Sequence, residues 1–97
     1  MRPDHVNVFG KRIPIKYKRL KAKGMLGCYD CIKQEIAIDA GLKYPSDEFW
    51  RVYLHEVFHA VFARHSFDQT ISPELEEMLV NSFALKVTEL FNLELKT

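Results

Sequence analysis

The first forty residues carry short apolar runs separated by turn-forming residues, a pattern typical of β-strands. Apolar and polar side chains alternate over residues 13–17, and with the apolar run at 6–9 they predict a hairpin whose second strand has one solvated face. Because Pro14 cannot donate a backbone hydrogen bond, we expect that second strand at an edge of its sheet. Two further short strands are predicted at 28–32 and 35–39.

The periodicity changes to that of a helix after residue 41. Pro45 and Ser46 offer a helix start with an N-cap, and the two acidic residues that follow suit the positive end of the helix dipole. We expect this helix to end near Arg64. A second start at Pro73, where proline is tolerated in the first helical turn, predicts a final helix over 73–92. The order of elements predicts an α+β fold, with a small antiparallel sheet followed by two long helices.

The size and composition of the chain are those of a single small domain. Its 97 residues are 47% hydrophobic and 28% charged, which provides apolar material for one core and not for two, so we expect one domain over 1–97. No apolar stretch reaches the roughly 18 residues of a membrane helix, and the N-terminus lacks the pattern of a secretory signal. These features predict a cytoplasmic protein with no membrane partner.

The charges are balanced in total but unevenly distributed. Fourteen Lys and Arg against thirteen Asp and Glu give a formal net charge of +1, which does not favour nucleic acid as a partner. Residues 1–23 nevertheless carry eight basic side chains and one acidic one, so the predicted hairpin is basic. A solvated strand face explains this excess most simply, and binding to an acidic partner is the alternative.

A catalytic metal site is indicated by the sequence His55-Glu56-Val57-Phe58-His59, which matches the pattern H-E-x-x-H in the middle of the first predicted helix. Residues four apart on a helix lie on one face, so both imidazoles can reach the same metal ion. In this motif the glutamate acts as general base on a metal-bound water and is not itself a ligand. The residues therefore predict two of the three ligands of a catalytic zinc site, together with its base.

A catalytic zinc site needs a third protein ligand, and three residues compete for this position. His65 follows His59 at the spacing of the third histidine in metzincins, but Phe62 replaces the glycine that turns the chain out of the helix in that pattern. The other candidates are glutamates in the first turns of the second helix. Periodicity places Glu76 nearer the middle of the apolar face, whereas small residues on both helices favour the side of Glu77. The pattern alone leaves the choice open.

A second segment extends the motif, because the second predicted helix contains Glu77-x-x-x-Asn81-x-Phe83-Ala84. Together with H-E-x-x-H, this segment resembles the ImmA/IrrE family of small bacterial and phage metallopeptidases, in which a later glutamate lies in a helix reading E-x-x-A-N-x-F-A. Val80 stands where that family often has alanine.

The resemblance implies a minimal zincin-like domain of the gluzincin type. It implies zinc-dependent hydrolysis of a protein or peptide substrate, in that family often a repressor, in a bacterial or phage cytosol. On the family pattern, zinc is held by His55, His59 and Glu77, and Glu56 is the catalytic base.

Two further expectations concern the substrate. The strand at 35–39 precedes the active-site helix, so we expect it to be the edge strand that lines the cleft and pairs with a peptide. Candidates for stabilising an oxyanion are Tyr29, Tyr53, Arg64 and His65.

Cys28 and Cys31 form a single C-x-x-C pair. A structural zinc site needs two more thiolates or histidines, and a redox pair of the thioredoxin type needs a βαβ context. We therefore interpret both as reduced cysteines of a strand.

The alternative to a peptidase is a protein of another class. It is a non-hydrolytic binding or regulatory protein that keeps the zincin scaffold and docks on a partner through the basic hairpin. Replacing Glu56 with glutamine separates the two hypotheses, because only the enzyme needs a general base.

Overall fold

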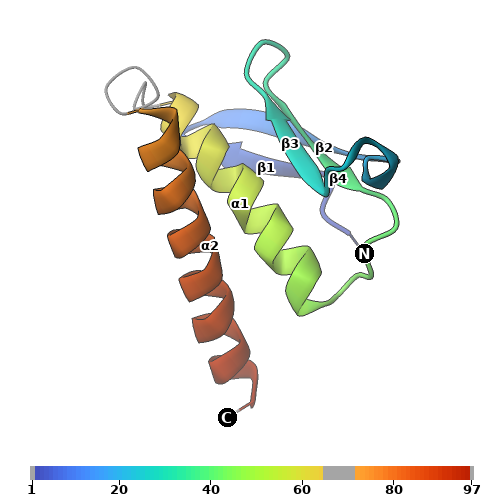
Figure 1. Cartoon of the computed structure of the whole chain (residues 1–97), viewed down its shortest axis with the longest axis vertical. Helices are drawn as coiled ribbons and strands as arrows, with labels where there is room; N and C mark the ends of the chain where they lie inside the picture. The colour runs from blue at the N-terminus through green and yellow to red at the C-terminus, as the bar shows by residue number, and fades with distance from the viewer. Residues whose placement is uncertain (1, 65–71, 97) are drawn as a thin grey trace.

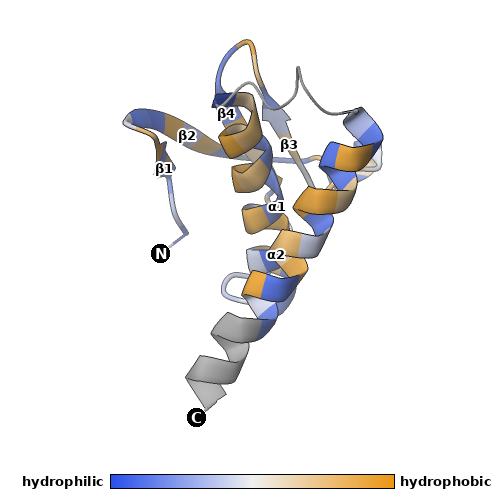
Figure 2. Ribbon diagram, turned by 90° about the vertical axis from the view of Figure 1, so that its left-hand side faces the viewer, coloured by the Kyte–Doolittle hydropathy of each residue, from blue (hydrophilic) through white to orange (hydrophobic). Residues whose placement is uncertain are grey.

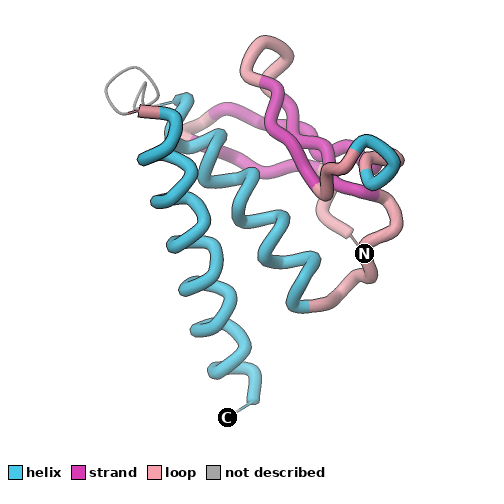
Figure 3. The backbone as a smooth tube through the Cα atoms, viewed as in Figure 1, coloured by secondary structure: helices cyan, strands magenta, loops and turns pink. Residues whose placement is uncertain are grey.

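The computed structural model describes residues 2–64 and 72–96, with side chains described up to residue 89. Within these residues, four strands precede two helices, and a 3-10 turn lies between the second and third strands (Figure 1, Figure 3). The elements are β1 (His5–Val8), β2 (Lys11–Lys18), η1 (Lys21–Lys23), β3 (Gly27–Asp30), β4 (Glu35–Asp39), α1 (Asp47–Arg64) and α2 (Pro73–Lys96). The predicted α+β class is confirmed.

The central element of the fold is α1, which packs against the sheet on one side and against α2 on the other (Figure 1). Most of its contacts with the sheet are to β1, β3 and β4. Figure 2 shows α1 as mostly hydrophobic, as a helix with two packed sides requires, whereas hydrophobic and hydrophilic residues are mixed along α2. Among the residues described, no helix is both long and apolar enough to cross a membrane.

The sheet has the strand order β1-β2-β4-β3 and mixes two pairing directions. The pairs β1–β2 and β3–β4 are antiparallel, but β2 and β4 run parallel. The prediction of an antiparallel sheet is therefore wrong for the central pair. The chain crosses from the end of β2 to β3 before the β3–β4 hairpin returns, and such a crossover is what parallel pairing needs.

The edge strand beside α1 also differs from the prediction. The segment Glu35–Asp39 is β4, an interior strand between β2 and β3, so the prediction that it forms the edge next to the site is wrong. That edge is β3, which pairs with β4 on one side alone within the described sheet.

Pro14 lies in an interior strand, which corrects the expectation that its strand is an edge. Pairing of β2 with β4 begins only at Ile15, whereas Pro14 is opposite His5 of β1. The amide of Ile15 donates to the Asp4 carbonyl on the β1 side, at 2.9 Å. Because successive amides point to opposite edges, the missing N–H of Pro14 falls on the other side, where β4 has not yet begun.

The core lies between the sheet and α1. Its centre is made of fully buried side chains from both layers, namely Ile13, Ile36, Ile38 and Phe49. Around Phe49, the rings of four aromatic residues pack face to face or edge-on: Tyr17, Tyr44, Trp50 and Tyr53. On α2, Val80 and Ala84 are buried as well. Each large apolar side chain buried in this way contributes about 1.5–3 kcal/mol.

Asp39, the last residue of β4, joins two connecting segments to the sheet. Its Oδ1 accepts the backbone N–H groups of Leu20 (2.8 Å) and Lys21 (2.9 Å), and its Oδ2 accepts that of Gly41 (3.0 Å). These hydrogen bonds, that of Lys21 foremost, hold the pKa of Asp39 below its ordinary value of 3.8, because they favour the ionised carboxylate. The residue thereby fixes both the start of η1 and the segment that leads to α1.

We predict that Asp39→Asn lowers the free energy of unfolding at pH 7, because the NH2 group of the new amide would face a backbone N–H that now donates to the carboxylate. A carboxylate whose pKa is depressed by folding stabilises the fold at pH values above its pKa in the unfolded state. This contribution is lost as the pH falls through its pKa in the folded state. Urea denaturation at pH 7 and at pH 3 measures the difference between wild type and variant. The difference should be smaller at pH 3, and an equal difference at both values would contradict this role.

Candidate metal centre

Two serine caps set the starts of the helices that carry the site. Ser46 Oγ accepts the backbone N–H of Phe49 at 3.1 Å, which confirms the predicted N-cap of α1. Ser72 Oγ likewise accepts the N–H of Leu75 at 3.1 Å at the start of α2. Since each residue turns a helix by about 100°, the place where a helix starts contributes to which side chains face its neighbour.

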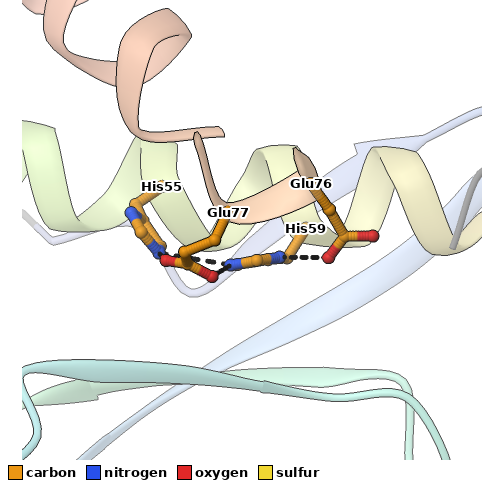
Figure 4. Close-up of polar contacts among 4 residues, drawn as sticks. All are labelled: His55, His59, Glu76 and Glu77. Carbon is orange, nitrogen blue, oxygen red and sulfur yellow. Dashed lines mark hydrogen bonds and ion pairs between the residues drawn. The ribbon is translucent and has the colours of Figure 1, made fainter. Parts of the chain in front are cut away.

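Three side chains from the two helices converge on one point (Figure 4). His55 Nε2 lies 2.9 Å from Glu77 Oε1, and His59 Nε2 lies 3.2 Å from Glu77 Oε2. The two Nε2 atoms are 3.2 Å apart. A tetrahedral ion with bonds of about 2.0–2.1 Å separates its ligand atoms by roughly 3.3 Å. The three side chains therefore have the spacing of metal ligands, and the group could hold a metal ion.

Glu76 occupies a different position from Glu77, although the two are neighbours in sequence. Its Oε2 lies 2.8 Å from Nδ1 of His59, the ring nitrogen that faces away from the convergence point (Figure 4). A carboxylate on the second nitrogen of a ligating histidine orients the ring and makes it more basic. Of the three residues competing for the third ligand position, Glu77 thus faces both Nε2 atoms and Glu76 supports His59. His65 lies outside the described residues.

Asn81 is a further neighbour of His55. Burial lowers the pKa of His55, and the neighbouring carboxylate of Glu77 and the side chain of Asn81 oppose this shift, because both favour the protonated ring. The neutral imidazole is the form that binds a metal ion, so burial favours the ligating state. Sequence reasoning gave Asn81 no role, although its position one helical turn after Glu77 is a signal that could have indicated one.

Glu56, the predicted general base, is buried on α1 beside the three converging side chains. Burial raises the pKa of its carboxyl to about 7; the neighbouring His59 lowers the pKa and the neighbouring Glu77 raises it, each to a smaller extent. Strand β3 passes close over this side chain. A Cβ at Gly27 would lie 2.9 Å from Val52 Cγ1 and 3.1 Å from Glu56 Oε2, so glycine is what permits the close approach.

The converging side chains open into a cleft of about 440 Å³ between β3 and the two helices. Its walls come from three parts of the fold. They are formed by Gly27, Cys28, Tyr29 and Cys31 around β3, by His55, Glu56, His59 and Ala63 on α1, and by Glu76 and Glu77 on α2. The cleft therefore gives solvent and a ligand access to the convergence point and to the edge of β3.

The four residues predicted to stabilise an oxyanion have different positions. Tyr29 lines the cleft. Tyr53 packs in the aromatic cluster around Phe49, and Arg64 donates to the Phe9 carbonyl at 3.5 Å. His65 belongs to the segment that the structure does not describe. Tyr29 is thus the one of the three described candidates that borders the cleft.

Cys28 and Cys31 are both free thiols. Cys28 lies in β3 as predicted, whereas Cys31 lies in the turn that follows and not in a strand. In the β3–β4 register Cys28 is opposite Ala37, so its side chain points to the sheet face opposite to that of the buried Ile36 and Ile38. The thiol of Cys28 is therefore on the face away from α1, even though its strand borders the cleft.

No protein-family profile, curated protein or solved structure matches the chain.

If the group holds a metal ion, Glu76→Ala should weaken its binding about 10- to 100-fold and leave the stoichiometry at one ion per chain, because His59 loses the carboxylate on its Nδ1 and keeps its Nε2. Titration with zinc in the presence of a competing chelator measures both quantities. Glu74→Ala is the matched control, since Glu74 is an exposed glutamate in the same turn of α2. An equal loss of affinity in both variants would contradict a specific role for Glu76.

Proposed function

We propose that this protein is a zinc-dependent metallopeptidase. The observation that carries the proposal is a His-His-Glu group with the spacing of metal ligands, next to a buried glutamate, in a cleft bordered by a sheet edge. The resemblance of residues 55–59 and 77–84 to the ImmA/IrrE family supports the same assignment.

The donor set supports zinc as the ion. Two imidazole nitrogens and one carboxylate, supplied by His55, His59 and Glu77, are the ligands of catalytic zinc in several peptidases, whereas calcium and magnesium prefer sites made of oxygen. When bound, zinc supplies a water with a pKa lowered to about 7 and a Lewis acid for a carbonyl group.

Glu56 would hold and transfer the proton in the reaction. A general base works best when its pKa is close to the working pH, and burial raises the pKa of Glu56 to about 7. Its side chain lines the cleft next to the convergence point. It can therefore take a proton from a water molecule in the cleft and return it to the leaving amine.

The edge of β3 would bind the peptide. Within the described sheet this strand pairs with β4 alone, so the amides and carbonyls of its other edge face the cleft. An extended peptide can add to such an edge as a further strand, with backbone hydrogen bonds that do not depend on its sequence. We assign this role to β3 and not to the segment Glu35–Asp39, because that segment is an interior strand of the sheet.

The biological setting belongs to the proposal as well. By resemblance, we assign the protein to regulatory proteolysis in a bacterial or phage cytosol, with a protein or peptide as substrate.

A second candidate function rests on the outer face of the sheet. Arg12, Lys16 and Lys18 alternate along β2 on the face opposite to the buried Ile13 and Ile15, and all three are exposed. A protein that binds an acidic partner through this basic hairpin would need no general base.

We predict that Glu56→Gln lowers the rate of peptide hydrolysis at least about 100-fold and leaves the zinc content unchanged, because glutamine has nearly the same shape but cannot accept the proton. Hydrolysis of a mixed peptide library, followed by mass spectrometry, measures the activity. Glu48→Gln makes the same change of charge at an exposed position of α1 and should keep the wild-type rate. A Glu56→Gln variant as active as wild type would refute the proposed mechanism.

A further inference from the structure

The cleft does not end at the metal-ligand group, because a second cavity of about 390 Å³ adjoins it. Both cavities are lined by Gly27, His55 and Glu56, so they meet where the reaction would take place. The residues that line only the second cavity come from the segment before β3 and from both helices. They are Gly24, Leu26, Arg51, Val52 and Asn81.

Arg51 gives the second cavity a positive charge. It is exposed and lies one helical turn before His55 on α1. Among the described residues, no carboxylate lies within ion-pair distance of its guanidinium group. Asn81 provides an amide on the opposite wall, one turn after Glu77 on α2. An unpaired guanidinium with an amide across a cavity offers hydrogen-bond donors suited to a carboxylate.

The first cavity offers no comparable charge to a substrate side chain. Glu76 and Glu77 line it, but Glu76 is paired with His59 and Glu77 faces the two Nε2 atoms. Among the described residues, Arg51 is the one Lys or Arg side chain that lines either cavity. A positive charge at one end of a cleft selects substrates by the position of their negative charges.

Simple geometry locates the substrate residue that Arg51 would meet. Four residues of helix separate Arg51 from His55, a rise of about 6 Å, and an extended peptide advances about 3.3 Å per residue. Arg51 is thus about two peptide residues away from the metal-ligand group. A peptide pairs with an edge strand more stably when it runs antiparallel to it. Strand β3 runs from Gly27, which lines both cavities, towards Cys31, which lines only the first cavity. A peptide antiparallel to β3 therefore has its C-terminal half over the second cavity.

We propose that the second cavity is a specificity subsite for an acidic side chain, about two residues after the scissile bond, with Arg51 as its determinant. This inference rests on the proposed peptidase function, whose cleavage point defines the position of the side chain.

The test uses peptides that differ only in having Glu, Gln or Lys at one position, with that position scanned over three residues on each side of the cleaved bond. The wild-type protein should cleave the Glu peptide with a kcat/KM about tenfold above that of the Gln peptide, and higher still above that of the Lys peptide, with the effect confined to the C-terminal side. Arg51→Glu should reverse the order of the Glu and Lys peptides.

Two variants serve as controls for Arg51→Glu. Lys43→Glu makes the same change of net charge in the segment before α1, outside both cavities, and should leave the order of the peptides unchanged. Arg51→Gln removes the charge without adding a carboxylate and should abolish the discrimination between Glu and Gln. Because Arg51 and Lys43 are both exposed, circular dichroism should show the same fold in all three variants.

Binding of the same peptides to Glu56→Gln, measured by fluorescence anisotropy, separates this inference from the proposed function. Tighter binding of the Glu peptide, lost in the double variant with Arg51→Gln, would support the acidic subsite even if wild type cleaved no peptide. Cleavage or binding that shows no preference for Glu, or a preference that Arg51→Glu leaves intact, would overturn the subsite while hydrolysis stands. Neither binding nor cleavage of any peptide would overturn both.

Discussion

The packing of α2 against α1 is the constraint on which the candidate site depends. No single element contains the site, because the two histidines project from α1 while the carboxylate that faces both Nε2 atoms comes from α2. The buried Val80 and Ala84 lie one and two turns further along α2 from Glu76 and Glu77. Apolar burial at Val80 and Ala84 thus holds Glu77 in place one to two turns earlier on α2. A shift of α2 by one residue would turn Glu77 by about 100° away from the two histidines.

Helix α1 lies between two different environments, the apolar core and the polar cleft. One side of α1 buries Phe49 and Ala60 in the core, and a neighbouring side carries the histidines of the cleft. Glu56 lies where these sides meet, and Gly27 lets the backbone of β3 come within van der Waals contact of it. This location accounts for the raised pKa of the carboxyl, since the packed strand removes water from it. A carboxyl group with a pKa close to neutral is in this way a consequence of close packing.

Local signals in the sequence were sufficient for the helices and insufficient for the sheet. Ser46 and Pro73 mark helix starts by their own chemistry, and the H-E-x-x-H spacing requires nothing but a helix to bring its histidines together. The direction of β4 relative to β2 could not be predicted in this way, because apolar and polar residues alternate alike in parallel and in antiparallel pairs. The pattern of residues alone also left the choice between Glu76 and Glu77 open, since both lie beside the helix interface. The ring nitrogens distinguish them, because Glu77 faces Nε2 of both histidines and Glu76 faces Nδ1 of His59. The position of Arg51 at the far end of the cleft likewise depends on the path of the chain before β3, which no local pattern determines.

We propose that one zinc ion is held by His55, His59 and Glu77. Crystals of the protein grown with zinc, with diffraction data collected at the zinc absorption edge, would locate this ion. The expected result is a single anomalous peak within about 2.0–2.2 Å of both Nε2 atoms and of a Glu77 oxygen, with Glu76 on Nδ1 of His59. A peak bound by Glu76 in place of Glu77, or no peak between the two helices, would contradict the claim.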